Sequence, residues 1–176
     1  MTVSSAAPVF PADAELPAMI AERASDAAQV EALIDRAFGP GRFVKTAERL
    51  REGRAPLRPL SFTCRVGGEL VGCVRQWSIS IGGRPAIFLG PFAVEGPWRS
   101  RGLGRALIRK ACEAAQAAGH GAILLVGDAP YFEPLDFQVV ERGRIIMPGP
   151  VDPRRLLLRA LTPNGAKDLR GPVAPG

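Results

Sequence analysis

The sequence predicts one α/β (α+β) domain built around a single mixed sheet. Apolar and polar residues alternate from Leu60 onward, which is typical of a strand with one buried face. Further along, residues 86–126 contain an apolar segment, an amphipathic helical stretch and a second apolar segment. A strand, a helix and a strand in succession favour parallel pairing through a right-handed crossover, so we expect the sheet to be mixed.

Length and composition fit one globular core with short extensions. The chain has 176 residues, of which 47% are hydrophobic and 23% are charged. Residues 1–15 are rich in Ser, Ala and Pro, and residues 163–176 are broken by Pro and Gly. We therefore expect one domain over 16–162, between an N-terminal tail, 1–15, and a C-terminal tail, 163–176.

The first part of the predicted domain is mainly helical. A short strand is expected over residues 18–22. Ser25 or Asp26 is a suitable N-cap for a following helix, whose apolar residues recur at helical spacing. Gly39-Pro40-Gly41 ends that helix, and a more polar helix is expected over 46–51.

A β-hairpin comes next, with Gly67-Gly68 as its turn. A two-residue turn at this point places Cys64 opposite Val71 and Phe62 opposite Cys73, all on one apolar face. Because polar residues alternate with these, we expect the first hairpin strand to be half-buried.

The chemically informative part of the chain follows the hairpin. Residues 86–94 are apolar enough for a strand in the middle of a sheet, and residues 102–118 predict a helix with one apolar stripe that ends at Gly119. The remaining expected elements are a buried strand over 122–126, a short helix near 130–133, a strand near 137–140 and a last strand over 155–161.

The charge and the cysteine content limit the class of protein. Lys and Arg number 23 against 17 Asp and Glu, which gives a net charge of +6 and favours an acidic partner. A nucleic-acid binder is disfavoured, because only 6% of residues are aromatic and none interleave with the basic ones in a stacking series. We expect no metal site, because the three cysteines lack CxxC spacing and fit reduced thiols.

Neither a membrane segment nor a secretory signal is expected. The longest uninterrupted apolar stretch, Ala122–Val126, is too short to span a bilayer. The first 20 residues lack a basic start followed by an apolar block. We therefore predict a cytoplasmic protein that does not act on a membrane.

A candidate phosphate-binding loop opens the helix at 102–118. Backbone amides at a helix N-terminus bind anions when side chains leave room, and two glycines here provide that room. Three arginines add guanidinium groups suited to a pyrophosphate. The loop residues are Arg99, Ser100, Arg101, Gly102, Leu103, Gly104 and Arg105.

The segment that ends in Val94 and continues into Arg99–Gly104 resembles the GNAT superfamily of N-acetyltransferases, in which [RQ]-x-x-G-x-[GA] follows a strand and opens a helix. Residues 35–40, 89–94 and 125–132 extend the resemblance to a bacterial branch of predicted acetyltransferases with unassigned substrates. It implies a mostly antiparallel sheet splayed between two parallel strands. It also implies acetyl-CoA as co-substrate, contacted by Phe92, Ala93 and Val94 as well as by the loop.

The resemblance also bears on catalysis. Many GNAT enzymes use a Tyr as the acid that protonates the leaving thiolate, but here the matching position is Phe132, and Tyr131 lies one residue early. Tyr131 is therefore the candidate acid, with a partly buried structural tyrosine as the alternative. Glu95 and Asp128 are candidate general bases, because each follows a strand that borders the expected cleft, although solvated carboxylates at strand ends are common.

The sequence leads to one preferred function and one alternative. We predict an N-acetyltransferase that transfers the acetyl group of acetyl-CoA to a primary amine by direct attack in a ternary complex. The amine could belong to a small molecule or a protein, and a homodimer is left open. The alternative is a GNAT-like module that binds acyl-CoA with weak or lost catalysis, which Phe132 favours; turnover distinguishes the two.

Overall fold

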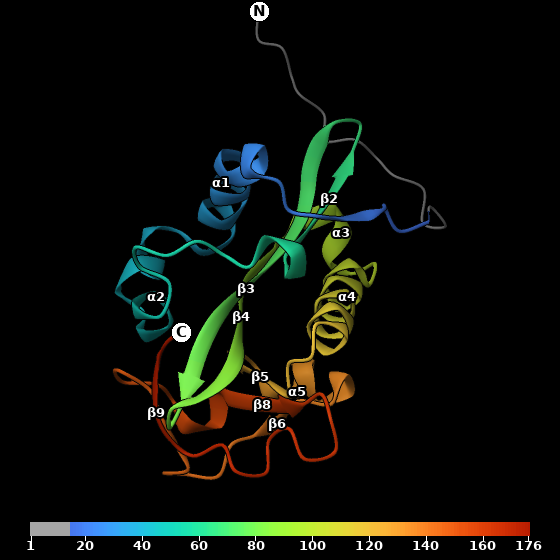
Figure 1. Ribbon diagram of the computed structural model, residues 1–176. Coiled ribbons are helices and arrows are strands. Elements are labelled where there is room, and N and C mark those ends of the chain that lie inside the picture. The colour runs from blue at the N-terminus through green and yellow to red at the C-terminus, as the bar shows by residue number, and fades with distance from the viewer. Residues whose placement is uncertain (1–14) are drawn as a thin grey trace, which may run out of the picture.

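The computed structural model describes residues 15–176, which form a twisted sheet with helices on both faces (Figure 1). The hydrogen-bonded strand order is β1-β2-β3-β4-β5-β8-β6, and β9 pairs with β3 and β7. The strands are β1 (Met19–Ala21), β2 (Phe62–Val66), β3 (Glu69–Ile81), β4 (Arg84–Val94), β5 (Ala122–Val126), β6 (Gln138–Val139), β7 (Ile145–Ile146), β8 (Leu156–Ala160) and β9 (Gly171–Pro175). The helices are α1 (Ala27–Phe38), α2 (Thr46–Arg49), α3 (Gly96–Arg99), α4 (Leu103–Ala117) and α5 (Ala129–Phe132).

The mixed sheet predicted from the sequence is confirmed. Most neighbouring strands are antiparallel, and β4 and β5 are parallel and joined by α4. The predicted short strand, both N-terminal helices, the hairpin and the helix after β5 are present within a residue or two of their expected limits.

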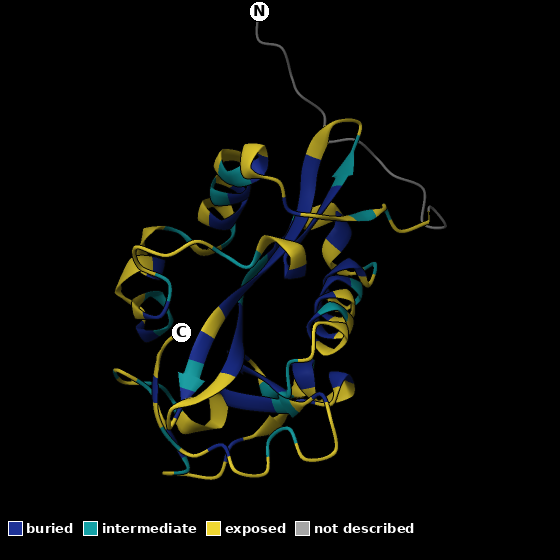
Figure 2. Ribbon diagram, in the orientation of Figure 1, coloured by how far each residue is buried: buried dark blue, intermediate teal, exposed yellow. Residues whose placement is uncertain are grey.

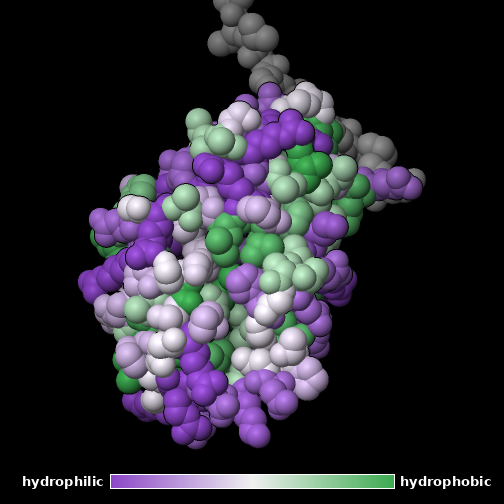
Figure 3. Space-filling model, in the orientation of Figure 1, coloured by the Kyte–Doolittle hydropathy of each residue, from purple (hydrophilic) through white to green (hydrophobic). Residues whose placement is uncertain are grey.

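Helices cover the two faces of the sheet differently. Helix α4 packs on one face, where Leu107 and Ile108 meet Ile123 of β5. Helix α1 lies on the upper part of the other face, as Figure 1 shows, and places Val30 and Leu33 in a separate cluster. Figure 2 shows that the central parts of β3 and β4 are buried between these layers. Hydrophilic residues dominate the surface around α2 and the C-terminal segments, and apolar residues gather near the middle of the same view (Figure 3).

The hairpin register predicted from the sequence is wrong beyond the turn. The two-residue turn sets Val66 opposite Glu69 and Arg65 opposite Leu70 as expected, but a bulge then pairs Cys64 with Gly72. Because a shift of one residue moves side chains to the other face, Cys73 packs toward α1 and Cys64 toward α4. Strand β2 was also predicted to be half-buried, but its first three residues are buried on both faces, and Thr63 is fully buried.

The parallel strands β4 and β5 separate soon after they pair. Ile87 pairs with Ile123 and Phe88 with Leu124, and no further pair joins these two strands in the described part of the chain. Strand β4 nevertheless continues along β3 as far as Val94. The C-terminal half of β4 therefore has one backbone edge that β5 does not cover.

An irregularity in β4 lies where the separation begins. Val74 pairs with Phe92 and Gln76 with Leu89, so β4 has one residue more than β3 between these pairs. The Trp77 indole N–H of β3 donates a 2.6 Å hydrogen bond to the Gly90 carbonyl oxygen in this bulge. The side chain of a neighbouring strand thereby holds the bulge in place.

The C-terminal segment contributes to the sheet. Residues 163–176 lie beyond the domain boundary predicted from the sequence, yet β9 pairs antiparallel with residues 79–81 of β3 and parallel with β7. Apart from residue 15, the predicted N-terminal tail lies outside the described residues.

A buried amide connects β3 to the helix that carries the candidate loop. Gln76 is fully buried, and its side-chain amide donates hydrogen bonds to the carbonyl oxygens of Leu60, at 2.6 Å, and Ala111 of α4, at 2.8 Å. The Gln76 backbone amide also donates to the Ser61 hydroxyl. One side chain therefore fixes the position of α4 against the sheet.

We expect Gln76→Ala to lower the free energy of unfolding by about 2–4 kcal/mol, because it removes two buried hydrogen bonds and leaves a cavity. Urea unfolding followed by circular dichroism measures the change. Gln116→Ala, at an exposed position of α4, is the matched control and should stay within about 0.5 kcal/mol of the wild type. Equal stability of the two variants would contradict the role given to Gln76.

Candidate functional site

The candidate loop, residues 99–105, runs from the end of α3 into the first turn of α4. Gly102 is the N-cap of α4 with φ +83°, a left-handed conformation that favours glycine. The first α-helical hydrogen bond runs from the Ala106 amide to the Gly102 carbonyl oxygen, so the amides of residues 102–105 have no partner within the helix. A Cβ atom at Gly102 would meet nothing within 4 Å. The helix N-terminus is open to a ligand at this point.

Each of the three arginines predicted for this loop contacts a neighbouring group. The Arg99 Nε–H donates to the Val94 carbonyl oxygen, at 2.9 Å, which ties the loop to the end of β4. The Arg101 guanidinium lies 4.6 Å from the ring centre of Trp98, which is buried beneath the loop. The Arg105 guanidinium lies 5.7 Å from the ring centre of Tyr131. Cations therefore flank the α4 N-terminus on several sides.

Gly104 marks the point where the loop, β4 and α5 meet. A Cβ atom at this position would lie 2.6 Å from the Tyr131 hydroxyl oxygen and 3.6 Å from side-chain carbons of Phe92 and Val94. A larger residue would displace one of them. The predicted loop residue Gly104 and the predicted acid Tyr131 are thus direct neighbours, together with two of the β4 residues predicted to contact the cofactor.

Aromatic side chains lie between the separated ends of β4 and β5. The Phe92 ring stacks on Tyr131 with centroids 5.9 Å apart, and Phe132 meets both rings at steep angles. Phe132 is only 4% exposed and packs against Phe137 below them. Tyr131 is half-buried and faces the loop, whereas Phe132 belongs to the core.

Burial raises the pKa of the Tyr131 hydroxyl above its ordinary value, and nearby Arg105 opposes that shift only in part. A phenol with a raised pKa stays protonated near neutral pH. Tyr131 therefore has a proton to donate under ordinary conditions.

The two predicted base candidates differ in their surroundings. The Glu95 carboxylate accepts hydrogen bonds from Arg36 of α1, at 2.6 and 3.1 Å, and forms an ion pair with it. Asp128 is exposed, and its backbone carbonyl accepts from the amides of α5. Asp128 forms no ion pair with another described residue.

A recess of about 450 Å³ lies on the α1 and α2 side of the sheet, and it borders the β4 bulge through Pro91. It is lined by Glu31, Arg42, Phe43, Glu48, Arg49, Arg51, Glu52, Gly53, Arg54, Arg75, Trp77 and Pro91. None of these residues has a functional role predicted from the sequence. A charged residue such as Arg75 within the apolar sequence of β3 is a signal that points to this region.

Arg75, which lines this recess, forms ion pairs with two glutamates. The Arg75 side chain is 5% exposed and donates to Glu22, itself 1% exposed, and to Glu31. Glu31 also accepts from Arg42, at 2.6 Å. Removing one partner of the fully buried Arg75–Glu22 pair costs about 3–5 kcal/mol. Glu31, which is 44% exposed, links α1 to Arg75 of β3.

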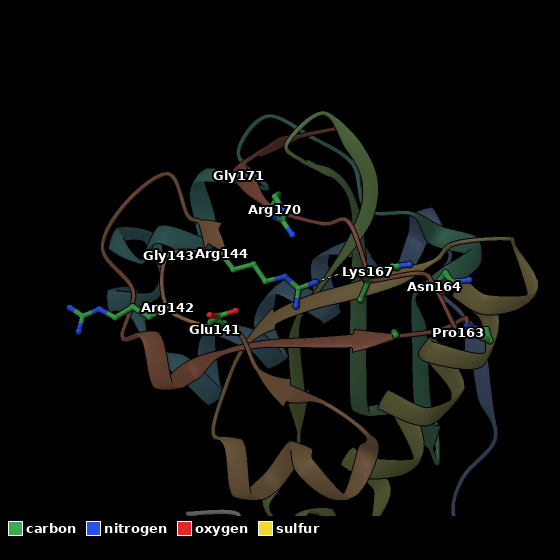
Figure 4. A pocket seen from close by; sticks show the side chains of 11 residues that line it. Glu141, Arg142, Gly143, Arg144, Pro163, Asn164, Lys167, Arg170 and Gly171 are labelled. Carbon is green, nitrogen blue, oxygen red and sulfur yellow. Dashed lines mark hydrogen bonds between the residues drawn. The ribbon is translucent and has the colours of Figure 1, made fainter.

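A second recess, of about 730 Å³, lies at the other end of β5 (Figure 4). It borders Ala160, which pairs with Ala122 at the start of that strand. Within it Arg144 donates to the carbonyl oxygens of Leu169 and Ala166, and so ties the segment before β7 to the segment before β9. This recess borders the start of β5, whereas Tyr131 follows the end of that strand, so the recess is separate from the candidate site.

Residues 15–176 contain no cluster of metal ligands and no candidate membrane span. Among these residues, no group of three or more His, Cys, Asp or Glu side chains is placed to hold a metal ion. None of their helices has the length and hydropathy needed to cross a membrane.

Comparison with known proteins gives a family and a fold. The model of the acetyltransferase (GNAT) family matches residues 27–131. No curated protein matches the sequence significantly.

Among solved structures, a GNAT family N-acetyltransferase (YhbS) from Escherichia coli, in complex with CoA, has a TM-score of 0.79 at 20% identity over 93% of this chain and 92% of that chain. A GNAT family acetyltransferase from Brucella melitensis, in complex with acetyl-CoA, has a TM-score of 0.68 at 23% identity over 90% and 95%. At these identities the likeness concerns the fold.

The cysteines offer no accessible nucleophile. All three are free and buried, and burial raises the pKa of Cys64 and Cys73 to about 12 and that of Cys112 to about 11. Because the thiolate is the reactive form, these thiols are inert at neutral pH in the folded protein.

We expect iodoacetamide at about pH 8 to label none of the three cysteines in the folded protein and all three after guanidinium denaturation, because only unfolding exposes them and returns their pKa to the ordinary range. Mass spectrometry of the intact chain counts the labels. Rapid labelling of any cysteine in the folded protein would show that its thiol is accessible.

Proposed function

The chain belongs to the acetyltransferase (GNAT) family, and on that premise we propose that it transfers the acetyl group of acetyl-CoA to a primary amine by direct attack in a complex that holds both substrates. The observation that carries the proposal is the meeting at Gly104. The open edge of β4, the N-terminus of α4 and the Tyr131 hydroxyl converge on this one residue.

The residues present suit the phosphates of acetyl-CoA. The amides of residues 102–105 are available as donors, the space above Gly102 is open, and Arg99, Arg101 and Arg105 supply positive charge. The uncovered edge of β4 at Phe92, Ala93 and Val94 offers backbone groups to an extended ligand. Ser100 and Leu103 complete the loop, with Leu103 buried beneath it.

The chain's own groups would supply proton transfer. Acetyl-CoA, when bound, supplies an acetyl group activated as a thioester, with the CoA thiol as leaving group. Tyr131 would donate its hydroxyl proton to the departing sulfur, and the raised pKa of this hydroxyl keeps that proton in place beforehand. Glu95 and Asp128 are the proposed acceptors of the amine proton, and Asp128 is the one without a recorded ion pair among the described residues.

One observation favours a second candidate function, an acyl-CoA-binding module with weak or lost catalysis. The position at which the family pattern expects an acid is Phe132, which is buried and carries no proton to donate. Turnover with an amine, compared with binding of CoA alone, distinguishes this function from the first.

We expect the double variant Gly102→Val, Gly104→Val to lose CoA binding in isothermal calorimetry. Valine at 102 conflicts with φ +83°, and valine at 104 collides with Tyr131, so the approach to the backbone amides closes. Gly41→Val, at an open position outside the loop, is the matched control and should bind CoA normally. A folded double variant with wild-type affinity would exclude the loop as the phosphate site.

We expect Tyr131→Phe to lower kcat by about 10²-fold or more, because the hydroxyl proton matters chiefly in the transition state. Steady-state assays of free CoA with the best amine measure the effect, and calorimetry should give nearly unchanged affinity for acetyl-CoA.

The outcome is informative in two directions. Phe132→Tyr in the Tyr131→Phe background should restore part of the rate if the family's usual position can be used. Wild-type kcat for Tyr131→Phe, once chemistry is shown to limit the rate, removes Tyr131 from the mechanism.

A further inference from the structure

The recess at the start of β5 carries an excess of positive charge (Figure 4). Its lining includes four cationic residues, Arg142, Arg144, Lys167 and Arg170, and one anionic residue, Glu141. None of these five forms an ion pair with another described residue. The described part of the chain therefore leaves the excess charge without a partner.

The recess beside the β4 bulge differs in this respect. There Arg42, Arg51 and Arg75 are each paired with a glutamate. At the start of β5 the neighbouring carboxylate of Asp168 does not play this part, because it lies outside the lining and pairs with Arg84 of β4 at 3.7 Å. Only the recess at the start of β5 combines a cluster of cations with so little balancing charge.

Arg144 is held in place by backbone groups and keeps part of its guanidinium available. Its Nε–H donates to the Leu169 carbonyl oxygen at 3.0 Å, and its Nη2 group donates to the Ala166 carbonyl oxygen. Its Nη1 group forms no hydrogen bond with a described residue. Carbonyl oxygens orient a guanidinium without neutralising its charge, so Arg144 offers an anion a donor that is already positioned.

A second guanidinium enters the recess from the segment before β9. Figure 4 shows Arg170 pointing into the recess toward the Arg144 side chain, whereas Arg142 points away from it. Like charges directed into one space repel each other. An anion between Arg144 and Arg170 would replace that repulsion by attraction on both sides.

The size and the lining of the recess indicate the kind of anion. Its volume of about 730 Å³ lies in the range of small-molecule sites. None of its lining residues is aromatic, so it offers no ring on which a nucleobase would stack. The Asn164 amide and the Glu141 carboxylate are suited to hydroxyl groups, and guanidinium groups are suited to phosphate.

From these observations we propose that this recess is a second anion site, and that it binds a small compound with two or more negative charges on phosphate groups. Arg144, Arg170 and Lys167 would bind the phosphates. The site is separate from the loop at the N-terminus of α4, and the inference does not depend on acetyl transfer. A bound anion would join the turn at 141–144 to the segment at 164–171, next to the pairing of β7 with β9.

Inorganic pyrophosphate is the probe for this site. The protein is the full chain with Gly102→Val and Gly104→Val, in which the candidate loop is closed, so that remaining binding reports the recess. Calorimetry at about 0.15 M salt, where exposed charges farther apart than about 8 Å are largely screened, should show binding below millimolar concentration. Wild-type protein saturated with CoA should bind pyrophosphate with the same affinity.

Exposed residues of the lining provide variants that leave the fold intact. Arg170→Ala should weaken pyrophosphate binding about 10-fold, the effect of one hydrogen bond to a charged group, and Lys167→Ala should act in the same direction. Glu141→Gln should strengthen binding about 2- to 5-fold, because it removes the one carboxylate of the lining. Arg58→Ala, which removes an exposed arginine outside the recess, is the matched control and should bind as the parent does.

Hydrogen exchange locates the bound probe without a substitution in the recess. Pyrophosphate should slow amide exchange in residues 141–146 and 164–171, which it would hold together, and leave α4 unchanged. Protection confined to other parts of the chain would contradict the location.

Several results would overturn the inference. These are the absence of pyrophosphate binding at millimolar concentration, an affinity that Arg170→Ala leaves unchanged, and an equal loss in Arg58→Ala. Tighter binding of citrate than of pyrophosphate would assign the recess to carboxylates instead. Binding of a polyglutamate peptide without binding of pyrophosphate would make it a docking surface for an acidic protein.

Discussion

The parallel pairing of β4 with β5 ends at Phe88, and the arrangement of the whole candidate site depends on that end. Backbone groups of a strand that leaves its neighbour must find other partners or a ligand. Here the β4 bulge turns the strand away, and the Trp77 indole fixes the bulge through the Gly90 carbonyl oxygen. Helix α4 can then bring its N-terminus against β4 because Gly104 has no side chain.

The separation of the strands is maintained by packing as well as by hydrogen bonds. Phe132 occupies the base of the space between the strand ends, with Phe92 and Tyr131 above it. A phenylalanine, Phe132, stands where the family pattern has a tyrosine, and it is buried in the core. Phe132 supports the strand ends from below, and the adjacent Tyr131 places its hydroxyl at the loop.

Local patterns predicted the elements on either side of the candidate loop, because glycine spacing, helical periodicity and apolar runs are readable within a short window. The parallel pairing of β4 with β5 followed from the succession of strand, helix and strand. The register beyond Cys64 did not, since a bulge depends on packing against β4 and α1 and has no signature of its own. Arg75 and its partners Glu22 and Glu31 are far apart in the sequence, so only the folded chain reveals their contact and the recess that Arg75 lines.

Strand β9 consists of glycine, proline, alanine and one valine, and it exists as a strand only because β3 and β7 supply its partners. This has a consequence for biosynthesis. The β4–α4–β5 unit can form from contacts that are close in sequence, but the edge of β3 at residues 79–81 waits for a segment made much later on the ribosome. Until then that edge of β3 is open to pairing with another nascent chain, which is a route to misassembly during synthesis.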